Sequence, residues 1–294
     1  MNDKLAAMRR AVIDIGTNTV KLLVADVQDG KILPIVSRDR TTRLGEGVGE
    51  SKRLSAAAIT RTVEAIGHFV ADAKDLGALE IVALTTSAAR DAVNGNEFLQ
   101  AVHNRCGLEV QVITGEREAE LIFHGVSSDP EWSNQPILVL DVGGGSAEFI
   151  QGERGNIERF QSLPLGAVRL TEQYGEDFAG LVGFLRETLH KSLAVYSVQN
   201  RRMIGTGGTI TTLARIERGT VDRVSISQEE LRALVARLNS LPLAERKKVP
   251  GLPPERADII VAGGAVFLVA MELLGAFELT VSVRNLRHGA LLSA

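Results

Sequence analysis

The chain has 294 residues, of which 45% are apolar and 23% are charged, and its formal net charge is −3. This composition is that of an ordinary globular protein with one large or two ordinary domains, and it excludes a disordered chain. The small net charge gives no general reason to expect a nucleic-acid partner. The single cysteine, Cys106, excludes an internal disulfide and a cysteine-based zinc site.

The N-terminal residues 1–10 include charges but no apolar core of signal-peptide length. No stretch of the sequence reaches the roughly 18 apolar residues that a membrane-spanning helix needs. We therefore expect a cytoplasmic protein with no membrane partner.

The first half of the chain is predicted to open with a three-stranded meander and to continue with helices and further strands. Ser55 stands where the N-cap of a long amphipathic helix belongs. The predicted strands are 11–15, 20–27, 31–39, 80–86 and 108–113, and the predicted helices are 56–76 and 97–106. Residues 41–50 and 87–95 are predicted to be polar connecting segments.

The second half repeats this order. It is predicted to contain two strands joined by a glycine-rich turn, a third strand, and then helices that alternate with short strands. The strands are 136–142, 147–150, 156–163, 202–206 and 277–283; the helices begin near residues 167, 178, 207, 228, 257 and 286. Both halves share the pattern strand, Asp-apolar-Gly, strand, strand, which indicates an internal duplication with a boundary between Gly125 and Gln135.

Two turns of this duplicated pattern carry residues suited to binding phosphate. Residues 14–19 (DIGTNT) place Asp14 at the end of a buried strand, ahead of a glycine and hydroxyl groups that suit an anion, although a hairpin turn capped by Asp fits equally well. Residues 141–148 (DVGGGSAE) contain three successive glycines, which a mere turn seldom needs, and Asp141 and Glu148 flank them as metal or water ligands.

Two further glycine motifs lie later in the chain. Residues 205–209 (GTGGT) open a helix, whose free amide groups favour an anion. Residues 262–265 (AGGA) lie within an apolar helix, where close helix packing is an equally good explanation.

The acidic run at 115–120 (GEREAE) falls between the two halves. A carboxylate there is suited to general base catalysis, although ordinary helix-start residues account for at least two of its three acids. Arg43 and Arg90 lie on polar loops after strands, where a guanidinium can clamp phosphate oxygens.

Taken together, these motifs resemble the exopolyphosphatase / guanosine pentaphosphate phosphohydrolase family over nearly the whole chain. The motifs that carry the resemblance are, in order, AVIDIGTNTVKLLV, RLGEGV, TTSAARDAVNG, GEREAELIFHGV, VLDVGGGSAEFI, SLPLGAVRLTE, GTGGTITTLA and VRNLRHGALL. The closing motif departs from the family in having Asn285 where glycine is common.

The resemblance implies an α/β fold made of two ribonuclease-H-like domains of the actin, Hsp70 and sugar-kinase superfamily, facing an interdomain cleft. We expect domain I at residues 1–126, with the first phosphate loop, and domain II at 127–294, with the second and third loops. Whether the last helix packs back on domain I is left open. The chain resembles the short two-domain form of the family.

The resemblance also implies the roles of individual residues. Glu118 matches the family's catalytic base, with Asp141 and Glu148 completing the catalytic set. The implied phosphate-binding residues are Thr17, Asn18, Arg90, Gly143, Gly144, Gly145, Ser146, Gly207 and Gly208, and the implied metal ligands are Asp14, Asp141 and Glu148.

The implied activity is hydrolysis of the terminal phosphate of inorganic polyphosphate, of short chains above all, with Mg²⁺ or another divalent cation as cofactor. A homodimer is expected by family analogy. Three alternatives stay open: a guanosine pentaphosphate 5′-phosphohydrolase, an ATP-dependent kinase or ATPase of the same superfold, and a non-catalytic regulator that binds polyphosphate or an alarmone.

Overall fold

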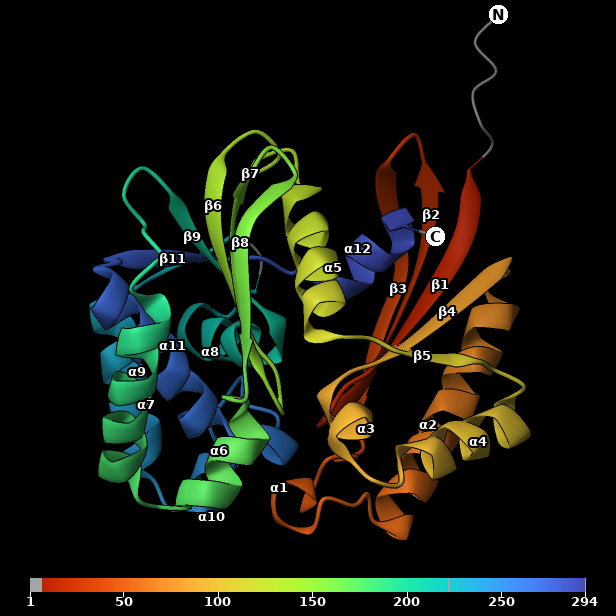
Figure 1. Ribbon diagram of the computed structural model, residues 1–294, viewed down its shortest axis with the longest axis horizontal. Coiled ribbons are helices and arrows are strands. Elements are labelled where there is room, and N and C mark those ends of the chain that lie inside the picture. Colours follow the sequence, from red (N-terminus) through yellow and green to blue (C-terminus); the bar gives the residue numbers. More distant parts are fainter. Residues whose placement is uncertain (1–6, 222, 294) are drawn as a thin grey trace, which may run out of the picture. The chain divides into compact units, whose positions relative to one another are not determined.

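The computed structural model describes residues 7–221 and 223–293, which divide into two compact units. Unit 1 takes in the described residues up to Ser128 and those from Leu286 onward, and unit 2 runs from Asp129 to Asn285. Each unit is built on one mixed β-sheet with helices packed against it (Figure 1). The α/β fold class predicted from the sequence is confirmed.

Unit 1 has a five-stranded sheet in the order β3-β2-β1-β4-β5. The first three strands are antiparallel neighbours, and β4 and β5 run parallel to β1. The strands are β1 (Met8–Ile15), β2 (Thr19–Gln28), β3 (Lys31–Thr41), β4 (Glu80–Thr85) and β5 (Val110–Val112). The helices are α1 (Val48–Ser51), α2 (Ala56–Asp75), α3 (Ser87–Asp91), α4 (Gly95–Cys106), α5 (Gly115–Ser127) and α12 (Leu286–Ser293).

The alternation of side chains along β1 divides unit 1 into two faces. Ala11, Ile13 and Ile15 belong to the apolar core that the sheet forms with α2 and α4. Val12 and Asp14 therefore point to the opposite face, which α12 covers. Asp14, next to the loop that follows β1, therefore lies on the face that α12 covers.

Unit 2 has a six-stranded sheet in the order β10-β11-β9-β6-β7-β8. Its strands are β6 (Pro136–Val142), β7 (Ala147–Glu153), β8 (Asn156–Leu163), β9 (Arg202–Thr206), β10 (Ser225–Ser227) and β11 (Glu278–Val281). Its helices are α6 (Ala167–Tyr174), α7 (Phe178–Leu193), α8 (Gly207–Arg218), α9 (Gln228–Ser240), α10 (Leu243–Arg246) and α11 (Ile260–Leu274), with a short 3₁₀ helix, η1, at Pro254–Arg256.

The two sheets share one topology. Strands β6, β7 and β8 form an antiparallel meander as β1, β2 and β3 do, and β9 lies parallel beside β6 as β4 lies beside β1. The duplication predicted from the sequence is therefore present in the fold, and it places Asp14 and Asp141 at equivalent ends of β1 and β6.

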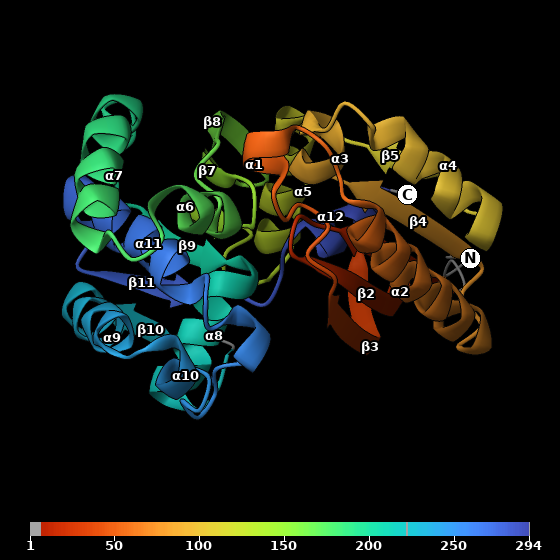
Figure 2. The same cartoon turned by 90° about the horizontal axis from the view of Figure 1, so that it is seen from below.

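The core of unit 2 is organised around α11. Every residue of this helix from Ile260 to Met271 is buried, as expected for a helix that is apolar on all sides. It packs against α6, α7, α8 and α9 (Figure 2).

Within the described ranges of the chain, no helix combines the length and the apolar character that crossing a membrane requires.

Several elements are absent from the sequence prediction. The longest is α5, which has 13 residues and of which only the first turn was considered, at the acidic run. The segments predicted to be polar connections contain α1 and α3, and β10 and α10 were also missed. These four elements have three to five residues, too few for a helical or strand period to appear in the sequence. Their contacts with neighbouring elements, which sequence cannot show, select their conformation.

The start of α9 provides a test of local stability. Ser227 Oγ accepts a hydrogen bond from Glu230 N at 3.2 Å, and Glu230 Oε2 accepts one from Ser227 N at 2.9 Å, so the two residues form a capping box. Hydrogen bonding by Arg218, followed by that of Ser227, lowers the pKa of Glu230 to about 2.

A carboxyl with a lowered pKa in the folded state stabilises the fold above its unfolded pKa and loses that effect as pH falls toward the folded value. We therefore predict that Glu230→Gln lowers the melting temperature at pH 7, and that its difference from wild type shrinks as pH falls from about 4.5 toward 2. Thermal unfolding followed by circular dichroism across this range tests it. Glu229→Gln, an exposed residue of the same turn, is the control; a deficit independent of pH would contradict the electrostatic explanation.

Candidate active site

The first phosphate loop is a tight turn between β1 and β2. Gly16 N donates to Thr19 O at 3.1 Å and closes the turn. The carbonyl of Thr17 accepts from Gly45 N at 2.8 Å, and that of Asn18 accepts from Thr42 N at 3.0 Å. The loop that follows β3 thus satisfies the carbonyl groups of the turn. It lies so close that a Cβ on Gly45 would stand 2.3 Å from the Thr17 side chain.

Helix α3 joins this loop to the predicted catalytic base. Ser87, at its first position, shares a hydrogen bond with Thr17 between hydroxyl groups 2.9 Å apart. Arg90, one turn later, donates from Nη1 to Ile113 O at 2.9 Å, and the same nitrogen lies 3.9 Å from Glu118 Oε2. Sequence reasoning singled out Arg90 and missed Ser87, although both stand in the same TTSAARDAVNG motif.

Glu118 differs from the other two acids of its motif. It is buried, with 8% of its surface exposed, whereas Glu116 is exposed and Glu120 pairs with Arg117 at 2.9 Å. Thr114 caps the helix by accepting from Arg117 N, so the fourth residue of α5 turns toward Arg90. Two of the three acids are thus helix-start residues, and one is a candidate base.

The second phosphate loop repeats the turn of the first. Gly143 N donates to Ser146 O at 3.0 Å, in the position that Gly16 and Thr19 occupy in unit 1. Here the carbonyls of Gly143 and Gly144 accept from Ala167 N and Val168 N, both at 2.9 Å, at the start of α6. In the part of the chain that the structure describes, the amide groups of Gly144 and Gly145 donate to no carbonyl or side chain. They are suited to a bound anion.

Close backbone contacts hold this loop and Asp141. A Cβ on Gly166 would stand 2.3 Å from the backbone of Gly144, so the chain before α6 can approach the loop only as glycine. Gly207 has a φ of +88°, and a Cβ there would stand 1.9 Å from the carboxylate of Asp141. The third motif therefore contacts the second through Asp141.

Asp141 and Glu148 face one another across β6 and β7 as cross-strand partners. Glu148 is 1% exposed, and its Oε1 accepts from Ser162 Oγ at 2.8 Å. Two carboxylates beside a phosphate loop are a suitable donor set for Mg²⁺, which is commonly held by one or two carboxylates with phosphate oxygens and waters. Within residues 7–221 and 223–293, no three His, Cys, Asp or Glu side chains cluster closely enough to hold a metal unaided.

The third motif opens α8 as predicted. Thr206 Oγ1 donates to Arg284 O at 2.7 Å, and Thr209 Oγ1 donates to Val142 O at 3.0 Å, which fixes the turn to β6. The guanidinium of Arg256 lies against Gly208, where a Cβ would stand 2.4 Å from its Nη1. Sequence reasoning missed Arg256, because η1 lies about 50 residues from the motif and has no signal of its own.

The fourth glycine motif is a packing feature. Cβ atoms on Gly263 and Gly264 would stand 2.7 Å from the Thr209 side chain and 2.8 Å from that of Val235. Both glycines are buried inside α11. They let neighbouring helices approach, which is the structural explanation that the sequence left open.

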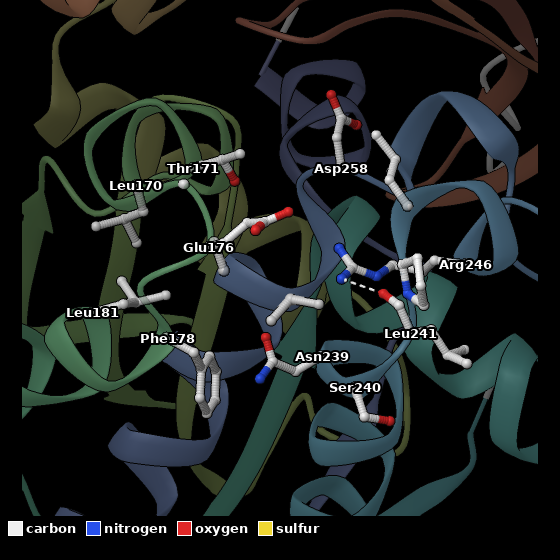
Figure 3. Close-up of a pocket in the computed structure, with 15 residues that line it drawn as sticks. Leu170, Thr171, Glu176, Phe178, Leu181, Asn239, Ser240, Leu241, Arg246 and Asp258 are labelled. Carbon is white, nitrogen blue, oxygen red and sulfur yellow. Dashed lines mark hydrogen bonds between the residues drawn. The ribbon is translucent and has the colours of Figure 1, made fainter.

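Unit 2 also contains a cavity of about 520 Å³ between α6, α7, α9 and α11 (Figure 3). The carboxylate of Glu176 and the guanidinium of Arg246 point toward one another inside it. Arg246 donates to the carbonyls of Leu238, Leu241 and Ala257. Burial lowers the pKa of Arg246, while the nearby charges of Glu176 and Asp258 raise it.

This cavity is a poor site for phosphate. Two carboxylates line it, the guanidinium already serves three carbonyls, and none of the sequence-predicted site residues is in its wall. The glycine-rich loops are therefore better candidates than this cavity for binding phosphate.

The predicted site residues form two groups. Asp14, Thr17, Asn18, Arg90 and Glu118 lie in unit 1, where α3 links the first loop to the base. The other group, in unit 2, consists of Asp141, Gly143, Gly144, Gly145, Ser146, Glu148, Gly207 and Gly208. The predicted metal ligands are divided between the groups, with Asp14 in unit 1.

Known proteins resemble this chain over nearly its whole length. A model of the Ppx/GppA phosphatase family matches residues 23–294. Exopolyphosphatase 1 of Mycobacterium bovis is 34% identical over 301 residues, which cover 97% of this chain and 88% of that protein.

Solved structures show the same likeness. The Aquifex aeolicus PPX-GPPA enzyme aligns with a TM-score of 0.82 at 32% identity, covering 98% of this chain and 99% of its own. An exopolyphosphatase from Cytophaga hutchinsonii aligns with a TM-score of 0.88 at 26% identity, covering 97% of both chains. These alignments confirm the fold that the sequence motifs implied.

The contact between Gly166 and the second loop yields a prediction. Gly166→Ala places a methyl group against the backbone of Gly144 and Gly145, so we expect the loop to shift and its affinity for phosphate to fall roughly tenfold or more. Isothermal titration calorimetry with inorganic phosphate measures this. Gly183→Ala, a helical glycine of the same unit with open space around it, is the matched control; equal affinities in the two variants would contradict the prediction.

Proposed function

Because this chain belongs to the Ppx/GppA phosphatase family, and is therefore a phosphoanhydride hydrolase, we propose that it is an exopolyphosphatase. It removes the terminal phosphate from inorganic polyphosphate, with a preference for short chains, and releases orthophosphate. Its similarity to exopolyphosphatases over almost its whole length supports this substrate class.

The observation that carries the proposal is the bridge formed by α3. This helix contacts the first phosphate loop through Ser87 and the buried Glu118 through Arg90. Helix α3 thus links the first phosphate loop to a candidate base. A hydrolase needs both a phosphate-binding loop and a base, whereas a protein that only binds phosphate needs no base. The pairing of GEREAELIF with TSAAR also favours hydrolysis over phosphate transfer by a kinase of the same superfold.

Phosphoryl transfer needs little covalent chemistry from the protein, so positioning and charge stabilisation supply most of the rate. In unit 2 the amides of Gly144 and Gly145 and the hydroxyl of Ser146 are the proposed donors to phosphate oxygens, and in unit 1 the hydroxyl of Thr17 has this role. Glu118 orients the attacking water and accepts its proton at the carboxylate. The remaining predicted phosphate contacts come from Asn18, Arg90, Gly143, Gly207 and Gly208.

Mg²⁺ or another divalent cation is the proposed cofactor. Asp141 and Glu148 are the proposed ligands in unit 2, and Asp14 is the proposed ligand in unit 1. When bound, the cation neutralises charge on the phosphate oxygens. The hydrogen bond from Ser162 on β8 fixes the carboxylate of Glu148.

The proposed setting is the cytoplasm, with a homodimer as the assembly and neither nucleic acid nor membrane as a partner. The single cysteine supports a cytoplasmic setting. The net charge of −3 supports the absence of a nucleic-acid partner. The dimer rests on analogy with the family alone.

A substrate panel tests the proposed function. Phosphate release is measured with Mg²⁺ for short polyphosphate, long polyphosphate, guanosine pentaphosphate and ATP, and the values of kcat/KM are compared. We expect the highest value for short polyphosphate and loss of activity on chelation of the cation. A higher value for guanosine pentaphosphate would assign the alternative phosphohydrolase activity, transfer from ATP to a sugar without hydrolysis would assign a kinase, and binding without turnover would assign a regulator.

The role of Glu118 gives a sharper prediction. Glu118→Gln removes the proton acceptor but keeps the side chain's size, so we expect kcat on polyphosphate to fall by about 10²–10⁴. Binding of imidodiphosphate, a non-hydrolysable analogue, should change by less than about twofold, because the loops are intact. Glu116→Gln, an exposed acid on the same turn, is the control. Turnover that survived in Glu118→Gln would exclude this residue as the base.

A further inference from the structure

The helix that carries Glu118 is packed mainly on the last helix of the chain. Among the described elements of unit 1, α5 makes its extensive contact with α12, and the two lie side by side in both views (Figures 1 and 2). The backbones touch at Gly289, where a Cβ would stand 1.9 Å from the carbonyl oxygen of Leu121. Leu121 is three residues after Glu118 on α5, so this contact lies one helical turn from the candidate base.

The other side of α12 is fixed to the sheet. Arg287, with 8% of its surface exposed, donates from Nη1 to Leu22 O at 3.0 Å and to Ser37 Oγ at 3.1 Å. Arg10 Nη1 donates to Leu291 O at 3.2 Å. The helix is therefore attached to β1, β2 and β3 by charged hydrogen bonds, which are stronger than neutral ones.

Arg287 is almost fully buried, and burial lowers its pKa. A buried guanidinium is costly unless it is hydrogen-bonded. The bonds to Leu22 O and Ser37 Oγ offset this cost, so the position of α12 depends on β2 and β3.

We propose that α12 positions the candidate base of unit 1: Gly289 sets how closely α5, and with it Glu118, approaches α12, and Arg287 fixes α12 to β2 and β3. This inference rests on the proposed function of Glu118 as the base. Gly289 and Arg287 are positioning residues, because neither is placed among the groups that contact substrate. The VRNLRHGALL motif, which supplies no catalytic group, acquires a role in the reaction through them.

The test is Gly289→Ala, with Gly183→Ala as the matched control, since the second glycine is also helical but faces open space. A methyl group at residue 289 has to push α5 away from α12. We expect kcat on short polyphosphate, expressed per folded molecule, to fall roughly 10- to 100-fold, with KM within about twofold of wild type. Amide hydrogen exchange in α5 should quicken, while exchange in α2 stays as in wild type.

A purely structural role would lower the folded fraction and leave kcat per folded molecule unchanged, and that result would overturn the proposal. If Gly289→Ala does not fold, Arg287→Lys decides, because it keeps the charge but loses the planar guanidinium; an unchanged kcat in a folded Arg287→Lys protein would also overturn the proposal. A wild-type protein without phosphatase activity would refute the proposed function alone, and hydrogen exchange in α5 would then decide whether α12 positions it.

Discussion

In both phosphate loops the backbone carbonyl groups accept hydrogen bonds from a supporting segment of the chain. The candidate site depends on these bonds, because they hold the loops in place. In unit 2, the carbonyls of Gly143 and Gly144 accept from the first amides of α6, which leaves the amide side of the turn for an anion. In unit 1, the carbonyls of Thr17 and Asn18 accept from the loop after β3. In both cases the supporting segment follows the third strand of the meander, so the duplication extends to the way each loop is held.

The two loops differ in what they offer to a phosphate group. At the positions of Thr17 and Asn18, unit 2 has Gly144 and Gly145, and it presents backbone amides where unit 1 presents side chains. A glycine lies close against each loop: Gly166 contacts the backbone of Gly144, and Gly45 contacts the side chain of Thr17. In unit 1 Ser87 also forms a hydrogen bond with the hydroxyl of Thr17. The candidate base Glu118 and Arg90 lie in unit 1, and the cross-strand pair of Asp141 and Glu148 lies in unit 2, so the two units offer different side chains.

Much of this could be read from the sequence because its signals are local. The apolar periods predicted the meanders and the long helices except α5, and the Asp-apolar-Gly turns located both loops. The capping residue Ser55 marked the start of α2. The short elements α1, α3, α10 and β10 were missed because distant contacts stabilise them, and α3 proves to be the bridge between loop and base.

The sequence by itself determined the fold class, the duplicated loops and the residue types available for phosphate chemistry, since these follow from side-chain period and turn propensity. Only the tertiary structure decided which acid of the GEREAE run is buried. Glu116, Glu118 and Glu120 are the same residue type, and they differ in burial because only one side of α5 packs against other elements. The tertiary structure also packs Arg256 against Gly208 and α12 against α5. These contacts join residues far apart in the chain, and packing between elements, which no local pattern encodes, fixes them.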